Sequence, residues 1–112
     1  MDALGFLTLL EARAGKADAV AEFLTSTAKP LADTEPGTLL WFAFRSGPNS
    51  YGVFDLFADE VARDIHLHGQ VRQALDARSD ELFSQAPQII PIQTLAAKLP
   101  ADWPSVEEAK SL

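Results

Sequence analysis

The residues best suited to acid–base chemistry in this chain are two histidines, which stand two positions apart as His66 and His68. On a strand, such a pair points the same way and can share a metal ion. On a helix, the two side chains lie about 200° apart. The apolar residues Val61, Ala62 and Ile65 recur before them at helical spacing. We therefore predict a helix that separates the two histidines, and no metal site.

His66 is the histidine expected to meet the rest of the protein. Ala62 and Ile65 are expected to face a sheet, and His66 lies beside them on the helix. A histidine in this place could orient a phenol or remove its proton, because its pKa lies near working pH. The alternative is a packing role, with a hydrogen bond to a backbone carbonyl or to Asp55. His68 is expected to face solvent.

Asp55 is the second candidate, because it stands in an otherwise apolar strand. Its expected neighbours on the same strand face are Tyr51, Val53 and Phe57. A carboxylate in such surroundings needs a partner, and His66 and Arg45 are the two candidates. The alternative is a structural ion pair with no part in chemistry.

Aromatic residues of a neighbouring strand could complete a pocket. Trp41, Phe42 and Phe44 follow one another closely, although aromatic residues in strands often belong to the core. The sequence contains no recognisable Ser-His-Asp set, phosphate-binding glycine loop or pair of catalytic carboxylates.

The composition indicates one globular domain. The chain has 112 residues, of which 47% are hydrophobic and 22% charged, and it has no cysteine, so neither disulfides nor thiolate metal sites are expected. Its net charge of -7 would repel phosphate backbones, which makes nucleic acid an unexpected partner. Without a long apolar run, we expect no membrane segment and a soluble, cytoplasmic protein.

Hydrophobic periodicity predicts six main elements. They are a strand at 5–13, a helix at 16–34, strands at 38–45 and 51–57, a helix from 59 to about 83, and a strand at 88–98. Pro30 is expected to end or kink the first helix near Lys29. Asp59 is expected to cap the second helix, and Gly69 to break it. Pro91 places the last strand at a sheet edge or a bulge.

The order β-α-β-β-α-β predicts an α+β, ferredoxin-like fold with an antiparallel sheet and both helices on one face. We assign this domain to residues 1–98. Residues 99–112 form a separate tail, in which Ser105 and Glu108 form a capping box for a short helix and Trp103 is a possible anchor.

The strands are apolar on both faces, which has a consequence for assembly. In 38–45, Leu39, Trp41 and Ala43 alternate with Leu40, Phe42 and Phe44. Helices on one side leave the other face as an exposed apolar patch. The simplest cover is a second copy of the sheet, so we predict a homodimer; the alternative cover is the C-terminal tail.

Residues 5–98 resemble the antibiotic biosynthesis monooxygenase (ABM) group of the dimeric α/β-barrel superfamily. Members of this group tend to carry a Glu-Pro-Gly turn before the second strand, here Glu35-Pro36-Gly37. Their third strand ends in an acidic residue and, two positions later, an aromatic one, here Asp55 and Phe57. A histidine follows nine residues later on the next helix, here His66.

The resemblance implies dimers whose sheets form a barrel, with a pocket between sheet and helices in each subunit. Some members bind polycyclic aromatics or quinols there and add oxygen from O2 without metal or flavin, so no cofactor is expected. Another branch degrades heme. This chain departs from the common pattern at Phe57, where tryptophan is frequent. Its first strand offers Thr8 where the heme-degrading branch has asparagine, which argues against heme.

Two functions therefore remain open. The first is a cofactor-independent monooxygenase for a small aromatic or quinol-type substrate, with His66 as base or orienting group and Asp55 supporting it. The substrate-binding residues are then expected to be Trp41, Phe44, Tyr51 and Phe57. The second is a non-catalytic dimer that binds a small molecule or has a structural role.

Overall fold

The computed structural model describes residues 3–101 of the chain. Its elements, in chain order, are β1 (Leu4–Glu11), α1 (Ala17–Glu22), η1 (Phe23–Ala28), α2 (Lys29–Ala32), β2 (Thr38–Arg45), β3 (Ser50–Phe57), α3 (Glu60–Leu67), α4 (Gln70–Leu82) and β4 (Gln88–Gln93). The strands begin and end close to the predicted positions. The exception is the last strand, which ends at Gln93 rather than at residue 98. The tail helix, its capping box and the Trp103 anchor lie outside the described residues, so they stay predictions.

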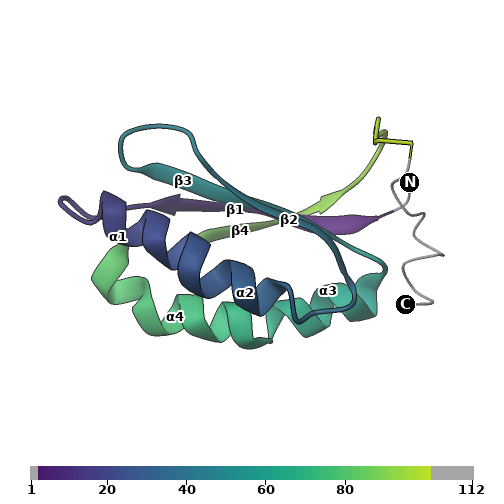
Figure 1. The fold of residues 1–112 in the computed structure, drawn as a ribbon, viewed down its shortest axis with the longest axis horizontal. Helices are drawn as coiled ribbons and strands as arrows, with labels where there is room; N and C mark the ends of the chain where they lie inside the picture. The colour runs from purple at the N-terminus through teal and green to yellow at the C-terminus, as the bar shows by residue number, and fades with distance from the viewer. Residues whose placement is uncertain (1–2, 102–112) are drawn as a thin grey trace.

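The four strands form one antiparallel sheet in the order β2-β3-β1-β4. All helices lie against the same face of this sheet (Figure 1). The predicted ferredoxin-like α+β fold is thus confirmed. β4 is an edge strand, as Pro91 indicated, since proline cannot donate a hydrogen bond to a further strand.

The core fills the space between the helices and one face of the sheet. Strand residues with buried side chains alternate with residues of the opposite face, as strand geometry requires. The buried core residues include Leu10, Val20, Phe23, Leu24, Tyr51, Val53, Leu75, Leu82 and Phe83. Burial of these side chains stabilises the fold and fixes which strand residues can meet a helix.

The first helix continues through Pro30 instead of ending near Lys29. It runs from Ala17 to Ala32, but the stretch η1 before the proline is π-helical. A proline ring clashes with the carbonyl four residues earlier in a regular α-helix. The wider π-helical turn accommodates the ring, so Pro30 makes the helix irregular without stopping it.

α3 is capped as predicted but rotated from the predicted orientation. The carboxylate of Asp59 accepts a hydrogen bond of 2.9 Å from the backbone N–H of Ala62. Ile65, which was expected to face the sheet with Ala62, is 61% exposed and Val61 is 68% exposed, whereas Ala62 is half-buried. The side that meets the sheet instead carries His66, which is 8% exposed. The cause is polar, because His66 has carboxylate partners inside the protein.

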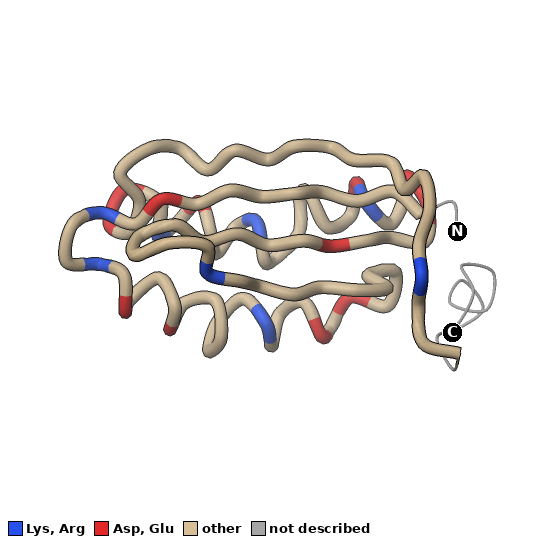
Figure 2. Tube along the Cα trace, turned by 90° about the horizontal axis from the view of Figure 1, so that it is seen from above, with Lys and Arg blue, Asp and Glu red and all other residues tan. Residues whose placement is uncertain are grey.

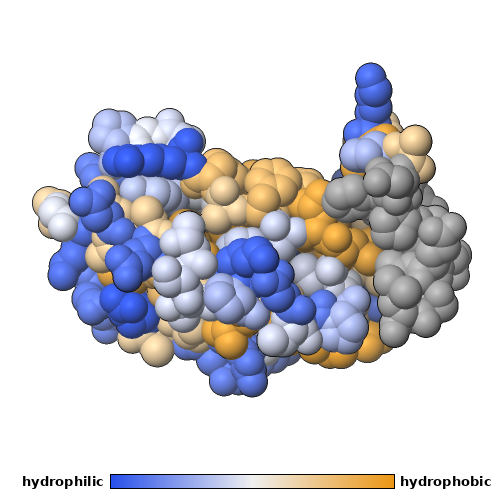
Figure 3. Space-filling view, viewed as in Figure 1, coloured by the Kyte–Doolittle hydropathy of each residue, from blue (hydrophilic) through white to orange (hydrophobic). Residues whose placement is uncertain are grey.

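The face of the sheet that the helices leave uncovered is apolar. Its large side chains are Leu7, Leu9, Leu40, Phe42, Phe44, Phe54, Leu56, Ile90 and Ile92. Figure 3 shows apolar surface along this side of the sheet. Figure 2 shows that charged residues lie mainly on the helices and near strand ends. Within the strands Asp55 is the exception, and it faces the helices.

No helix within residues 3–101 combines the length and the apolar character needed to cross a membrane.

Candidate functional site

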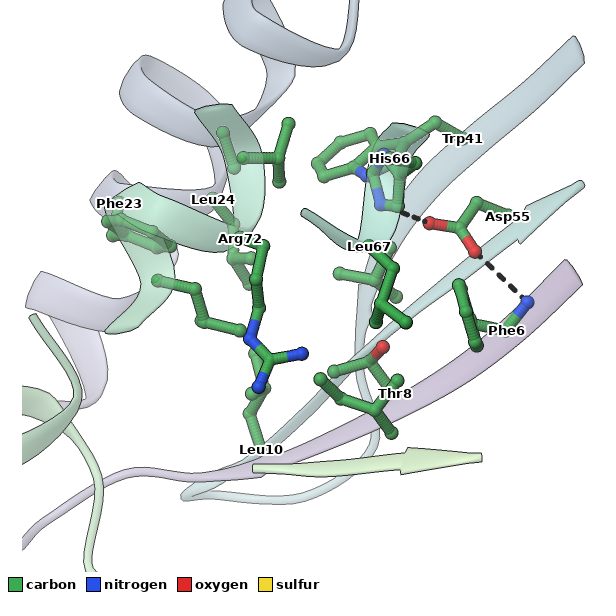
Figure 4. A pocket seen from close by; sticks show the side chains of 15 residues that line it. Phe6, Thr8, Leu10, Phe23, Leu24, Trp41, Asp55, His66, Leu67 and Arg72 are labelled. Carbon is green, nitrogen blue, oxygen red and sulfur yellow. Dashed lines mark hydrogen bonds and ion pairs between the residues drawn. The ribbon is translucent and has the colours of Figure 1, made fainter. Parts of the chain in front are cut away.

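His66 lies between two carboxylates that come from different parts of the fold. Its Nδ1 is 2.5 Å from Oε1 of Glu35, in the turn before β2, and its Nε2 is 3.1 Å from Oδ2 of Asp55 on β3. The other oxygen of Asp55 accepts a hydrogen bond of 3.2 Å from the backbone N–H of Phe6 on β1. α3 therefore brings one imidazole into a polar cluster beneath the sheet. Figure 4 shows the contacts of Asp55 with His66 and with the N–H of Phe6.

The Glu35-Pro36-Gly37 turn places the first of these carboxylates. Gly37 lies so close to α3 that a Cβ atom on it would be 2.6 Å from the Cβ of Ala62. Its carbonyl accepts a hydrogen bond of 3.1 Å from Ala58 N–H, which ties the turn to the end of β3. The hydroxyl of Thr38 donates to Oε1 of Glu35 at 2.9 Å. Only glycine allows the turn to approach α3 this closely. This close approach brings Glu35, which belongs to the same turn, beside the helix that carries His66.

The geometry favours a doubly protonated His66. Carboxylates only accept hydrogen bonds when ionised, and a neutral imidazole has a single N–H to give. An imidazolium donates to both Glu35 and Asp55. Burial alone would lower the pKa of His66, but the hydrogen bonds and charges of Asp55 and Glu35 outweigh it and raise that pKa.

Asp55 is shifted in the same sense. Burial raises its pKa, and this outweighs the opposing effects of the His66 contact and the Phe6 N–H. Only 2% of Asp55 is exposed, which explains why burial dominates. Both shifts mean that the folded protein binds protons at this site more tightly than the free side chains do.

A small cavity adjoins the cluster between sheet and helices. It measures about 40 Å³ and is lined by Phe6, Thr8, Leu10, Phe23, Leu24, Ala28, Trp41, Val53, Asp55, His66, Leu67, Val71, Arg72, Leu75 and Ile89. The lining is mostly apolar, with Asp55 and His66 as its buried ionisable groups. Figure 4 shows Trp41 and Asp55 beside His66, and Arg72 on another side near Leu10 and Thr8. The described part of the chain thus has an apolar chamber with a charged pair in its wall.

The structure brings some of the predicted site residues together and separates others. His66, Asp55 and Trp41 all line the cavity. Phe57 is fully buried and packs against the His66 ring, with ring centres 4.8 Å apart, but it does not line the cavity. The structure thus places Phe57 beside the imidazole rather than in the cavity wall.

The structure places three of the expected neighbours away from the cavity or from Asp55. Phe44 lies on the opposite face of the sheet, opposite Gly52, because strand residues alternate and Trp41 already occupies the helix-facing side. Tyr51 does not line the cavity, since its hydroxyl donates to the carbonyl of Ala17 at 2.9 Å. Arg45 is no partner of Asp55, because its guanidinium donates to loop carbonyls.

Glu35 is the site residue that the sequence did not reveal. It lies 31 positions before His66, and no local pattern links the two. The available signal was its place in the Glu-Pro-Gly turn, which stood out only as part of the family pattern.

The two histidines are separated as predicted. His68 is the C-cap residue that follows α3 and is exposed, while His66 is buried. Within residues 3–101, no three side chains of His, Cys, Asp or Glu are grouped to hold a metal ion. Both nitrogens of His66 are already engaged by carboxylates, which leaves neither free as a ligand.

The chain is similar to several solved structures. One of them is similar enough in sequence to show the family of the chain, and the others show its fold. A protein of unknown function from Nitrosomonas europaea is 50% identical, covers 90% of this chain and 97% of its own, and superposes with a TM-score of 0.85. A candidate antibiotic biosynthesis monooxygenase from Caulobacter crescentus is 23% identical over 85% of this chain and 92% of its own, with a TM-score of 0.73. A protein from Mycobacterium tuberculosis is 16% identical over 85% of this chain and 97% of its own, with a TM-score of 0.74.

No protein-family model and no curated protein matches the sequence. The similarity to the Caulobacter and Mycobacterium structures extends over the whole βαββαβ domain, which is the fold predicted from the Glu-Pro-Gly turn, Asp55, Phe57 and His66. The chain therefore belongs to the same family as the Nitrosomonas europaea protein, and its fold is that of an antibiotic biosynthesis monooxygenase-like domain.

Proposed function

We propose that this protein is a cofactor-independent monooxygenase that acts on a small aromatic substrate. The observation that supports this most strongly is the apolar cavity with the buried Asp55–His66 pair in its wall. Buried ionisable groups with shifted pKa values in a cavity are typical of catalytic sites. The ABM-like fold of the chain agrees with this reading.

In the proposed reaction, the carboxylate of Asp55 accepts a proton from the substrate. His66 holds that carboxylate in position. Both nitrogens of His66 face carboxylates, so neither is available as a base toward the cavity. Asp55 keeps free lone pairs, and a raised pKa makes its carboxylate a stronger base than an ordinary aspartate. Of the two roles considered for His66, the orienting one therefore fits better.

The chemistry balances without a reductant. Asp55 removes a proton from an activated CH2 group of the substrate, and the resulting carbanion gives an electron to O2. One oxygen atom then enters the substrate as a carbonyl and the other leaves as water, so that the CH2 group supplies all four electrons. The protein provides an apolar chamber, the base, and a fixed positive charge on His66 that stabilises the anion.

The size of the cavity limits the substrate. A chamber of about 40 Å³ has room for O2 or water, whereas drug-sized ligands need several hundred Å³. An aromatic ring fits only if side chains at the partly exposed wall, such as Leu67 and Arg72, move outward. We therefore propose a substrate of one or two rings rather than a large polycyclic one.

The second candidate is a non-catalytic protein that binds a small ligand in the same cavity. The small volume favours it, and so does Phe57, which stands where tryptophan is common in the family pattern. The His66 cluster would then be a buried structural network.

Ligand screening followed by oxygen uptake separates the two candidates. Single-ring and two-ring phenols and ketones are first screened by thermal unfolding, since a ligand at a hundredfold excess over its Kd stabilises by about 2.7 kcal/mol. Ligands that bind are then tested for O2 consumption. We expect Asp55→Asn to lower turnover at least about 100-fold with binding retained. Binding without O2 uptake in the wild type would leave the non-catalytic candidate.

We further propose that the uncovered sheet face is the interface of a homodimer. Leu9, Phe42 and Ile90 on this face are 38%, 47% and 41% exposed, and Phe42 contacts the rings of Phe44 and Phe54. An apolar surface of this kind marks a protein–protein contact, and the ABM-like fold is typical of dimers that pack sheet to sheet.

Light scattering tests the dimer. We expect Phe42→Lys to give a monomer, because it places a charge in the middle of the apolar face. The matched control is Val61→Lys, on the exposed side of α3, which should stay dimeric. A wild-type protein that is monomeric at micromolar concentration would refute the proposal and favour cover by the C-terminal tail.

A further inference from the structure

Trp41 has an unsatisfied hydrogen-bond donor beside the cavity. Its indole Nε1 is the one buried side-chain nitrogen or oxygen in residues 3–101 that has no hydrogen-bond partner. Buried polar groups in folded proteins are nearly always paired, so an orphaned donor needs an explanation. Trp41 is also one of the residues that line the cavity.

The position of Trp41 relative to Asp55 makes this donor informative. The two residues are directly opposite each other on β2 and β3, and both face the helices. Side chains paired in this way start from Cβ atoms about 5 Å apart. In Figure 4 the indole lies beside His66, on the side of the cavity that Asp55 also borders. The wall thus offers an N–H donor next to a carboxylate.

Trp41 offers a hydrogen-bond donor at this wall of the cavity, and Asp55 beside it offers an acceptor. Each oxygen of Asp55 already has one donor, Phe6 N–H or His66, but ionised carboxylate oxygens accept more than one hydrogen bond. An indole N–H cannot accept at all. A ligand that satisfies both groups presents an acceptor oxygen to Trp41 and an acidic hydrogen to Asp55.

We propose that Trp41 is a specificity-determining residue that selects aromatic ligands carrying a carbonyl or comparable acceptor oxygen. The acceptor binds the indole N–H and directs the acidic hydrogen of the ligand toward Asp55. This inference rests on the proposed function, because it assumes that the cavity receives a small aromatic molecule. Before the ligand binds, a water molecule is the natural partner of the N–H, and the carbonyl replaces it.

Two probes of equal shape test the proposal: acetophenone and α-methylstyrene, in which a CH2 group replaces the carbonyl oxygen. The chain has two tryptophans, and Trp103→Phe leaves Trp41 as the single indole signal in a ¹H–¹⁵N NMR spectrum. We expect acetophenone to move the indole proton downfield and to bind about tenfold more tightly than α-methylstyrene, the difference that one hydrogen bond makes. A 3-hydroxyacetophenone probe should bind more tightly than acetophenone in the wild type and lose this advantage in Asp55→Asn.

Trp41→Phe keeps an aromatic ring and removes the donor. In this variant we expect acetophenone and α-methylstyrene to bind equally. The comparison of the two probes on the wild type remains decisive if the variant does not fold. Equal binding of both to the wild type, or saturable binding of acetophenone with an unmoved indole proton, overturns the proposal while leaving the cavity as a binding site. If none of the probes binds at millimolar concentration, the proposed function fails as well.

Discussion

The Glu35→Gln variant tests the account of the buried cluster most directly. Glutamine removes one negative charge but keeps an oxygen that can accept the Nδ1–H of His66, which is 2.5 Å from Glu35. Burial opposes the charge on His66, and the carboxylates of Asp55 and Glu35 together overcome it. We therefore expect a lower pKa for His66 in the variant than in the wild type.

The same change has a predictable effect on stability. His66 has a folded-state pKa above its ordinary value of 6.5. The contribution of His66 to the free energy of unfolding is thus fully present below pH 6.5 and is lost as the pH rises through its folded-state pKa. The slope for one proton is about 1.4 kcal/mol per pH unit, and a domain of this size loses roughly 4–8 °C in Tm per kcal/mol. We expect a wild-type Tm that falls by roughly 6–11 °C per pH unit above pH 6.5, until His66 is deprotonated.

In Glu35→Gln the decline of Tm with pH should end at a lower pH. The reason is that the folded-state pKa of His66 lies closer to its unfolded-state pKa in this variant. At about pH 6 the variant should also be less stable by roughly 1–2 kcal/mol, the difference between a charge-assisted and a neutral hydrogen bond. Asp55 has the same effect on stability at lower pH, because its folded-state pKa is raised above 3.8. Its contribution to the free energy of unfolding is present below pH 3.8 and is lost as the pH rises through its folded-state pKa.

The assay combines an NMR titration with thermal unfolding from about pH 6 to about pH 9. Both proteins carry His68→Gln, so that His66 gives the only imidazole signal; His68 is exposed and its replacement should leave the fold intact. An identical His66 pKa in the two proteins would refute the role assigned to Glu35. If the wild-type Tm stays constant or increases as the pH is raised from 6.5, the stabilisation assigned to the His66 proton is refuted.

Two further predictions concern the elements that hold the site. Gly37→Ala should lower the free energy of unfolding by about 1–3 kcal/mol, because the new Cβ would lie 2.6 Å from the Cβ of Ala62. Chemical denaturation measures this loss. The control is Gly47→Ala, whose new Cβ would have its nearest contacts at 3.5 Å. Asp59→Ala should cost about 0.5–2 kcal/mol through loss of the α3 cap. Asp64→Ala on the exposed side of the same helix should change stability little, and equal losses at the two aspartates would contradict the capping role.

The fold could be predicted because each element has a local signature. The strands are apolar runs bounded by turn residues, and Asp59 marks the start of α3 by a capping interaction within the helix itself. The order of these elements leaves few topologies with short connections. The C-terminal end of β4 was placed too late, because the apolar character of the sequence continues beyond Gln93, whereas strand pairing ends there and is followed by a hydrogen bond from Thr94 N–H to the carbonyl of Ala3.

The candidate site was only partly predictable, because its partners meet through the tertiary fold. The apolar stripe of α3 suggested that Ile65 faces the sheet, yet His66 does so because two distant carboxylates stabilise it there. Glu35 could not be linked to His66 without knowing that the turn packs against α3. By contrast, the alternation of side chains along a strand already places Phe44 and Trp41 on opposite faces of the sheet. The prediction that both residues line one pocket did not take this alternation into account.

The π-helical stretch η1 has a consequence for comparing relatives of different length. A π-turn contains one more residue than an α-turn, so it acts as a single-residue insertion within the helix that joins β1 to β2. Deleting one exposed residue there, such as Ser26, would remove the extra residue of the wide turn without moving either strand. Phe23, Leu24 and Ala28, which line the cavity, would shift relative to one another. A one-residue gap at this point in an alignment therefore signals an altered cavity wall rather than an altered fold.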